Sequence, residues 1–422
     1  MADEPAPPQQ QEVLRAVSAR DMRLAIGCTP APVEQIEAWE AYEKSQGNTL
    51  FGRYVFECDG KPTAVLALYR HRIGGRPFLW AKHGPVWLKE QSPAREARLR
   101  QMLVREVRRR EPRTVFIRMH ARYRARDTLE LLSTITYDRT YVIDLTPREP
   151  KAIASAMPRA GRRGVLRAER VAREAGCTIA EETGLSREEF ESLYAVMSET
   201  ARRDGFRPHP SDVYWDMLTT LGPEHARLFV LRRDGEPHCW DLVTVSGKRA
   251  VAYYGASSSA SRGFRGAEAL DWFVARTMAA EGCDGLDLMG ADSARVPELY
   301  GVGQYKRRFA QHPTEVDGAW DVPVHPLIYR ALRRARRARH FVRDRLGVTV
   351  VIITHEMSVV RAVCDSVSLL EAGRVVESGP IEDVVADVAS RLSRELVPAP
   401  AVPAGSVRPD DAVIDVALTA RP

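Results

Sequence analysis

The feature that most constrains the fold of this sequence is an order of β-rich and helical segments that occurs twice. In the first half, two β-rich runs meet at Asp59-Gly60, and an amphipathic helical segment and a short apolar strand follow. In the second half, three β-rich runs meet at Asp234-Gly235 and Ser246-Gly247, and again a helix and a strand follow. Such dipeptides between β-rich runs are typical of hairpin turns. The repeated order predicts a structural duplication, although the residues themselves do not repeat.

The composition is that of a globular protein. A chain of 422 residues with 44% hydrophobic side chains is long enough for two or three domains with real cores. The net charge of +6 comes from Arg in a few segments, which favours a polyanionic partner. The sequence contains no apolar run of membrane-spanning length and begins with a polar, Pro-rich segment, so we expect a cytoplasmic protein. Its 6 cysteines form no CxxC pair, which predicts reduced structural cysteines and no metal site.

Six segments of the second half follow one another in the order and spacing of a known family. They are MPRAGRRGVLRAERVAREAGCTI, ETARRDGF, LRRDGEPHCWDLVTV, AYYGASS, GLDLMGADS and GVGQYKRRFA. From Arg159 to Pro323, this set resembles the Fem family of peptidoglycan interpeptide-bridge transferases, of the lipid II:glycine glycyltransferase type. From Met22 to Leu145, the likeness lies only in the layout and in the segment from Trp39 to Lys44.

The resemblance implies an α+β protein with two tandem domains like those of GNAT (acyl-CoA N-acyltransferase) proteins. In chain order we expect a disordered lead (1–18), a first GNAT-like domain (19–148), a second GNAT-like domain (149–323), a basic helix packing on the first domain (324–345), a partial ABC-ATPase-like fragment (346–398) and a disordered tail (399–422).

The resemblance also implies an aminoacyltransferase that uses aminoacyl-tRNA. An aminoacyl ester on tRNA would pass to an amine on the stem peptide of a cell-wall precursor, supplied as UDP-MurNAc-pentapeptide or as lipid II. The enzyme must hold two polyanions, stabilise a tetrahedral oxyanion and remove a proton. No cofactor other than the aminoacyl-tRNA co-substrate is implied. We expect a monomer. Its positive charge could also serve peripheral contact with the inner membrane face, which is the alternative to tRNA binding.

The resemblance assigns catalysis to Lys306 in the motif QYKRRF, with Tyr305 packing beside it. A fixed ammonium there would stabilise the oxyanion or the departing ribose; a lysine in a basic loop is the alternative. No general base is assigned, because His120 stands where an acidic residue is expected and a strand-end carboxylate such as Asp287 is more often structural. The residues assigned to precursor binding are Trp39, Lys44, Arg203, Phe206, Arg207, His209, Tyr214 and Tyr254.

Three of these assignments leave alternatives open. Arg207 and His209 compete for the place of a second phosphate-binding arginine. Tyr214 and Tyr254 can equally serve as packing residues of a helix and a strand. Lys44 follows Trp39 by one residue more than the family spacing.

Two helical segments, Met157–Glu174 and Tyr329–Arg345, are rich in arginine and poor in acidic residues. Helices of this kind attract phosphate backbones with salt-dependent affinity, and a solvated face with i,i+4 ion pairs is the alternative. The residues that we assign to tRNA binding are Arg162, Arg163, Arg167, Arg333, Arg336 and Arg337.

Three other functions compete with aminoacyl transfer. A CoA-dependent N-acyltransferase would share the fold, and SRGFRGAEAL approaches its pyrophosphate loop with a different glycine spacing. A non-catalytic binding protein would keep the duplicated fold without activity. An ATPase is suggested by the segment from Leu346 to Ser390, which resembles the last part of the ATP-binding subunit of an amino-acid or methionine importer, with His355 in the place of its γ-phosphate-sensing histidine.

ATP hydrolysis has further requirements that this sequence does not meet. It needs a G-x-x-x-x-G-K-[ST] loop and, for magnesium, an apolar strand that ends in Asp-Glu. The sequence contains neither of these, nor an LSGGQ-type segment. We therefore expect residues 346–398 to be a fused fragment without ATPase activity.

Overall fold

The computed structural model describes residues 11–132, 136–346, 366–371, 374–380 and 415–417. The chain divides into two compact units. The larger unit runs up to Arg70 and continues over Leu79–Arg110 and Ile117–Val322. The smaller unit comprises His71–Phe78, Glu111–Phe116 and the chain from Pro323 onward.

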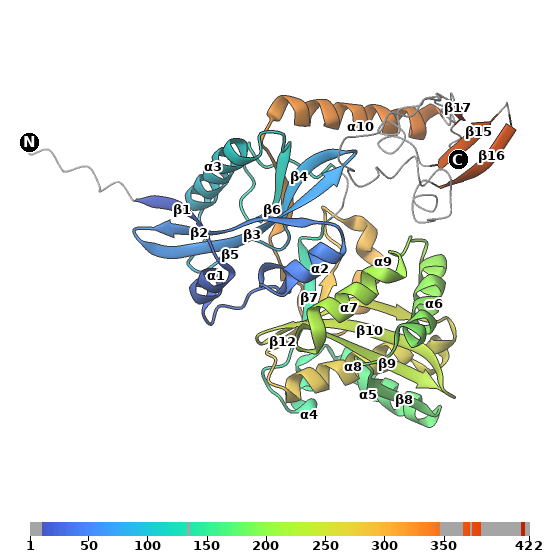
Figure 1. The fold of residues 1–422 in the computed structure, drawn as a ribbon. Helices are drawn as coiled ribbons and strands as arrows, with labels where there is room; N and C mark the ends of the chain where they lie inside the picture. The colour runs from blue at the N-terminus through green and yellow to red at the C-terminus, as the bar shows by residue number, and fades with distance from the viewer. Residues whose placement is uncertain (1–10, 133–135, 347–365, 372–373, 381–414, 418–422) are drawn as a thin grey trace, which may run out of the picture. The chain divides into compact units, whose positions relative to one another are not determined.

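The first sheet has seven strands in the order β1-β2-β3-β4-β6-β14, with β5 beside β3 (Figure 1). The predicted hairpin between β2 and β3 is confirmed, because Asp59 and Gly60 have the positive φ angles of 50° and 71° that a tight hairpin turn requires. The strands are β1 (Glu12–Val17), β2 (Thr49–Cys58), β3 (Lys61–Ile73), β4 (Arg76–Ala81), β5 (Val86–Trp87), β6 (Phe116–Ala121) and β14 (Gly318–Pro323). The helices of this half are α1 (Ala19–Ile26), the 3₁₀ turn η1 (Val33–Gln35), α2 (Trp39–Ser45) and α3 (Pro93–Arg110).

The second sheet also has seven strands, in the order β13-β7-β12-β11-β10-β9-β8. Its hairpins at Asp234-Gly235 and Ser246-Gly247 lie where the sequence predicts them. The strands are β7 (Arg139–Asp144), β8 (Cys177–Glu181), β9 (Ala226–Arg233), β10 (Glu236–Ser246), β11 (Arg249–Ser257), β12 (Gly285–Gly290) and β13 (Thr314–Glu315). The helices are α4 (Pro150–Ala156), α5 (Arg159–Glu174), α6 (Arg187–Asp204), α7 (Ser211–His225), η2 (Ala260–Phe264), α8 (Gly266–Ala280), η3 (Pro297–Leu299) and α9 (Tyr300–Lys306).

The two sheets exchange strands. β7 precedes residue 149, where the second domain was expected to begin, yet it pairs with β12 of the second sheet. β14 follows that sheet in the sequence but belongs to the first sheet, where Asp321 forms a buried ion pair with Arg118 of β6 at 2.7 Å. Local sequence patterns do not specify which distant strand becomes a neighbour, so this exchange could not be predicted.

Helices cover both faces of the second sheet. α6 and α7 pack on one face through Phe190 and Leu218 against Trp240. α5 and α8 pack on the opposite face, where Val165 and Trp272 belong to a separate cluster of buried residues. This layered arrangement of a mixed sheet between helices holds the strand ends that form the candidate site.

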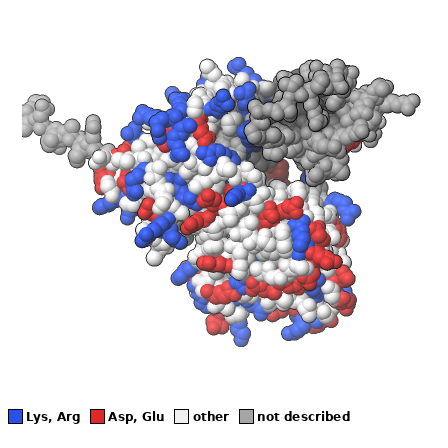
Figure 2. All heavy atoms as spheres, in the orientation of Figure 1, with Lys and Arg blue, Asp and Glu red and all other residues white. Residues whose placement is uncertain are grey.

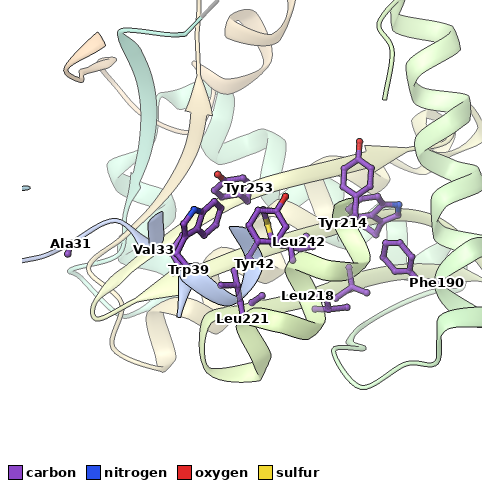
Figure 3. Packing of buried hydrophobic residues seen from close by; sticks show 14 of the residues in the cluster. Ala31, Val33, Trp39, Tyr42, Phe190, Tyr214, Leu218, Leu221, Leu242 and Tyr253 are labelled. Atoms are coloured by element: carbon purple, nitrogen blue, oxygen red, sulfur yellow. The ribbon is translucent and has the colours of Figure 1, made fainter. Parts of the chain in front are cut away.

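One buried cluster contains residues of both sheets. Trp39 and Tyr42 of α2 lie in the same cluster as Tyr253 of β11 and Tyr214 of α7 (Figure 3). The rings of Trp39 and Tyr42 are 4.7 Å apart, and those of Trp39 and Tyr253 are 6.1 Å apart. The two halves of the larger unit therefore share a core instead of touching only through polar surfaces.

The smaller unit contains α10 (Pro326–Leu346) and three strands. Tyr329 of α10 is fully buried, and its ring meets that of Phe116 edge to face at 5.4 Å. β15 (Ser366–Glu371) and β16 (Arg374–Pro380) form an antiparallel pair, and β17 (Asp415–Ala417) joins β15. β15 and β16 flank residues 372–373, and His355 lies outside the described residues.

No helix in the described part of the chain combines the length and the apolar character needed to cross a bilayer.

Candidate active site

The candidate site is a pocket in the second sheet where two parallel strands separate. β11 and β12 pair only between Arg249–Val251 and Gly285–Asp287. Beyond that point, residues of both strands line a cavity of about 790 Å³. α6, α8 and α9 and the loop before α8 complete its walls. The separation of two strands therefore creates a space in which backbone groups and side chains can meet a ligand.

Lys306 and Tyr305, the residues predicted to be catalytic, both line this pocket. Lys306 is the last residue of α9, and its ammonium donates a hydrogen bond of 2.8 Å to the carbonyl oxygen of Gly290 at the end of β12. Burial lowers the pKa of Lys306 to about 8, so a large part of the amine is neutral just above physiological pH. The phenol of Tyr305 donates to the carboxylate of Asp271.

Two acidic residues that the sequence analysis did not select lie in the same pocket. Asp241 comes from β10 and Asp271 from α8, and their carboxyl groups share a hydrogen bond. Burial raises the pKa of Asp271 to about 6 and raises the pKa of Asp241 well above its usual range. One signal could have identified them, because a single aspartate stands inside an apolar strand pattern in HCWDLV and inside an apolar helix pattern in ALDWF.

Arginines line the pocket on its more exposed side. Arg203 donates to the carbonyl oxygen of Ser257 at 2.6 Å. Arg265 and Arg308 both contact the carboxylate of Glu268. Arg262, on the turn before α8, is exposed. The pocket therefore has exposed positive groups and a carboxyl pair that is only partly exposed.

The basic helix α5 packs directly beside this pocket. A side-chain carbon added at Gly161 would lie only 1.7 Å from the carbonyl oxygen of Arg308, so the helix approaches the backbone just after Lys306 very closely. The predicted tRNA-binding residues on this helix, Arg162, Arg163 and Arg167, are exposed.

The other predicted tRNA-binding residues lie on α10 of the smaller unit. Arg333 is half-buried, Arg336 is exposed, and the side chain of Arg337 lies outside the described part of the chain. On the face shown in Figure 2, Lys and Arg gather over α3, which the sequence analysis did not assign to binding. The exposed arginines of α3 include Arg105, Arg108 and Arg109.

Of the residues predicted to bind the precursor, Arg203 lines the pocket and the others lie elsewhere. Trp39 is buried, whereas Lys44, Phe206 and Arg207 are exposed. Tyr214, Tyr254 and His209 lie together: the first two rings are 4.7 Å apart, and His209 is 6.1 Å from Tyr214 and 6.0 Å from Tyr254. Tyr254 follows Tyr253, which lines the pocket, so this aromatic group lies next to the pocket wall.

A different lysine occupies the place where the two sheets share their core. The ammonium of Lys82 lies over the rings of Trp39 and Tyr253, 5.3 and 5.2 Å from their centres. The phenol of Tyr253 donates to Glu34 at 2.8 Å, and burial raises the pKa of Tyr253 well above its usual range. The four side chains thus form a cation-π and hydrogen-bond cluster that the sequence analysis missed.

The residues at the two positions weighed for a general base, neither of which was assigned that role, have structural partners. Asp287 forms an ion pair with Arg249 at 2.9 Å and accepts hydrogen bonds from Thr140 and from the backbone of Met289. The ring of His120 stacks on another histidine at 4.7 Å, and burial lowers its pKa to about 3. Within the described ranges, the structure contains no cluster of three His, Cys, Asp or Glu residues that could hold a metal ion.

Comparisons with known proteins agree with this geometry. Residues 159–307, which carry most of the pocket, match the acetyltransferase (GNAT) domain family. The fold is similar to a crystal structure of FemX, with a TM-score of 0.61, 14% sequence identity, and coverage of 76% of this chain and 100% of that chain. Residues 159–307 are therefore similar to the GNAT domain, and the fold is α+β with two tandem GNAT-like domains.

The curated relatives match this chain over a short segment, which is also a small part of their own length. The chain is 53% identical over 57 residues to the methionine import ATP-binding protein MetN 2 of Yersinia pestis bv. Antiqua (strain Antiqua), which is 14% of this chain and 17% of that protein. It is 47% identical over 73 residues to MetN of Streptomyces griseus, which is 17% of this chain and 20% of that protein. The chain thus spans less than two thirds of these relatives, and the similarity supports a partial ABC-ATPase-like segment.

Proposed function

We propose that this protein transfers an aminoacyl group from tRNA to an amine on the stem peptide of a peptidoglycan precursor. The observation that carries the proposal is the placement of Lys306 and Tyr305 in the pocket between β11 and β12, within a fold similar to FemX. The resemblance of the QYKRRF motif to the Fem family predicts this pair of residues as the catalytic site. Lys44 and the aromatic group of Tyr214, Tyr254 and His209 remain candidates for holding the precursor, whereas Trp39 is fully buried in the shared core.

The reaction forms one bond and breaks one bond. The neutral amine of the acceptor attacks the ester carbonyl carbon, a C–N bond forms, and a negative charge develops on the carbonyl oxygen. The bond from that carbon to the ribose oxygen then breaks, and the proton lost by the amine goes to the ribose oxygen. The ammonium of Lys306 would stabilise either developing oxygen charge, and its hydrogen bond to Gly290 holds it in place.

The arginines support a polyanionic donor. Arg262, Arg265 and Arg308 line the pocket, and α5 adds exposed arginines beside it through its close packing at Gly161. Such a surface attracts a phosphate backbone without recognising the base sequence. We therefore propose that the 3′ end of a charged tRNA enters the pocket while its stem lies along α5.

The direct test incubates the full chain with a panel of charged tRNAs and with UDP-MurNAc-pentapeptide or lipid II. A mass increase of one or more aminoacyl groups on a precursor is expected. No mass increase on either precursor with any charged tRNA would contradict the proposal. Transfer that persists at the same rate in a Lys306→Ala variant would contradict the assignment of the catalytic residue.

A CoA-dependent N-acyltransferase is the second candidate, because residues 159–307 match an acetyltransferase domain family. The loop before α8 lines the pocket. At Gly266, the first residue of α8, an added side-chain carbon would lie only 2.9 Å from the Cys239 sulfur. Acetyl-CoA that raises the melting temperature and donates its acetyl group to an amine would support this candidate. Absence of both effects would leave aminoacyl transfer as the better explanation.

A further inference from the structure

Two of the four acidic residues that line the pocket have no basic partner. Asp204 pairs with Arg203 at 2.7 Å, and Glu268 pairs with two arginines. Within the part of the chain that the structure describes, neither Asp241 nor Asp271 forms an ion pair with a Lys, Arg or His. Their cavity thus contains a negative charge that the protein itself does not neutralise by contact.

The structure holds this carboxyl pair firmly in place. Asp271 accepts the hydrogen bond of the Tyr305 phenol and shares a second one with Asp241. On β11, a side-chain carbon in place of the Gly255 hydrogen would lie 2.5 Å from the carboxylate oxygen of Asp241. Glycine is therefore required at this position for Asp241 to occupy its place in the pocket.

The two carboxyl groups differ in their tendency to ionise. Burial and the repulsion between the two carboxylates both raise the pKa of Asp241 well above its usual range, which favours its protonated form as a donor beside Asp271. Lys306 lowers the pKa of Asp271 through space, but its ammonium donates to Gly290 instead of to the pair. Asp271 thus remains a hydrogen-bond acceptor for a donor placed in the cavity.

The pocket lining combines exposed arginines with less exposed carboxyl groups. Arg262 and Arg308 are exposed, whereas Asp241 and Asp271 are half-buried and burial raises the pKa of both. A ligand that matches this polarity has phosphate groups at one end and a positively charged amine at the other. The aminoacylated 3′ end of a tRNA has both, and an acetyl thioester of CoA has only the phosphates.

We infer that Asp241 and Asp271 bind the α-ammonium group of the donor and thereby select aminoacyl groups over neutral acyl groups. This inference rests on the proposed aminoacyl transfer and adds a determinant of donor specificity. A neutral acyl group in the same place would leave the desolvated charge without a partner, which is unfavourable. The pair acts on binding of the donor, whereas Lys306 acts on the oxygen charges of the reaction.

The test compares two non-hydrolysable mimics of the tRNA end that differ in one group. Both are 3′-amido adenosine 5′-phosphates; one carries a glycyl group and the other the matching hydroxyacetyl group, so that neither has a side chain to be rejected. Calorimetry measures their affinities for the full-length protein. A charged hydrogen bond of this kind predicts that the glycyl mimic binds about 10- to 100-fold more tightly.

Variants of the same size separate the charge from the shape. Asp241→Asn with Asp271→Asn removes the negative charge and keeps both side-chain volumes, so the preference for the glycyl mimic is expected to disappear. Each single variant retains one ionisable carboxyl group and is expected to lose less of the preference. Asp234→Asn, in the exposed turn between β9 and β10, is the matched control and should keep the preference of the wild type. Melting temperatures show whether each variant is folded.

Several outcomes would overturn the inference. The inference is wrong if the wild-type protein binds the two mimics with equal affinity. It is also wrong if the wild-type protein binds neither mimic. A preference that survives in the folded double variant would also exclude the pair as its cause. The charged-tRNA assay decides separately on the proposed function, because transfer that uses aminoacyl and hydroxyacyl esters equally well would retain that function and reject only this inference.

Discussion

Replacing Lys306 by methionine is expected to make the protein more stable and less active. The pKa of this lysine falls from 10.5 to about 8 in the folded protein, which corresponds to a cost of roughly 3 kcal/mol for keeping it charged at neutral pH. The variant also loses the hydrogen bond to Gly290, worth about 1 kcal/mol. The free energy of unfolding at pH 7 should therefore rise by about 2 kcal/mol, measured by urea denaturation.

The same substitution removes a cation from the reacting centre. Loss of one preorganised group that stabilises a developing oxygen charge lowers the turnover number by about 10²- to 10³-fold. The rate of aminoacyl transfer to the precursor measures this effect. Lys61→Met, in the exposed hairpin between β2 and β3, is the control and should change stability by less than about 0.5 kcal/mol without affecting transfer.

The pH dependence gives an independent check on Lys306. Because its folded pKa of about 8 lies below the unfolded value of 10.5, the unfolded state binds more protons between these two pH values, and stability should rise with pH across this window. Transfer that depends on the ammonium should fall above pH 8. Lys306→Arg keeps its charge and should not show this fall. A methionine variant that transfers at the wild-type rate, or a wild-type rate that continues to climb above pH 8, would refute the assignment of the ammonium.

Three further perturbations test packing and organisation. Gly161→Ala should lower both the melting temperature and transfer, because its side chain would collide with the backbone after α9, whereas Gly164→Ala on the same helix has ordinary contacts at 3.6 Å and should be neutral or slightly stabilising in both assays. Asp321→Asn should cost about 3–5 kcal/mol in urea unfolding because it removes the buried negative charge that faces the guanidinium of Arg118, and a loss below 1 kcal/mol would contradict this. Deletion of residues 346–398 should leave transfer intact, and loss of activity would show that this segment has acquired a role.

Much of the fold could be predicted from local patterns. The turns at Asp59-Gly60 and Asp234-Gly235 and the amphipathic helix of the first half, α3, follow from side-chain periodicity and turn chemistry, and the structure contains all three. The strand exchange of β7 and β14 could not be predicted, because it depends on pairing between segments far apart in the chain. Duplication of a pattern indicates two similar sheets and leaves open which strands each sheet contains.

The site could be predicted only where a motif is contiguous. Lys306 and Tyr305 are neighbours in the sequence and share the pocket. Asp241 and Asp271 belong to different elements, and neither residue alone indicates that the two carboxyl groups meet. The cluster around Lys82 could not be predicted either, because its aromatic neighbours come from α2 and β11.

The exchanged strand β7 bears directly on catalysis. Thr140 of β7 is paired with Gly290 of β12, and its hydroxyl contacts the carbonyl oxygen of Met289 at 2.7 Å. The carbonyl oxygen of Gly290 in turn accepts the hydrogen bond of Lys306. β7 therefore fixes the strand end that holds the lysine, although it lines no part of the pocket.

This dependence predicts different behaviour for two fragments that both contain the whole pocket. A fragment of residues 149–316 lacks β7, so β12 has an open edge, and we expect aggregation and no transfer. A fragment of residues 137–316 retains β7 and β13, and it should be more soluble and should melt at a higher temperature. Size-exclusion chromatography and thermal unfolding compare the two fragments. Equal solubility and equal melting temperatures would show that β12 holds its shape without β7, and that the position of Lys306 depends on the pocket walls alone.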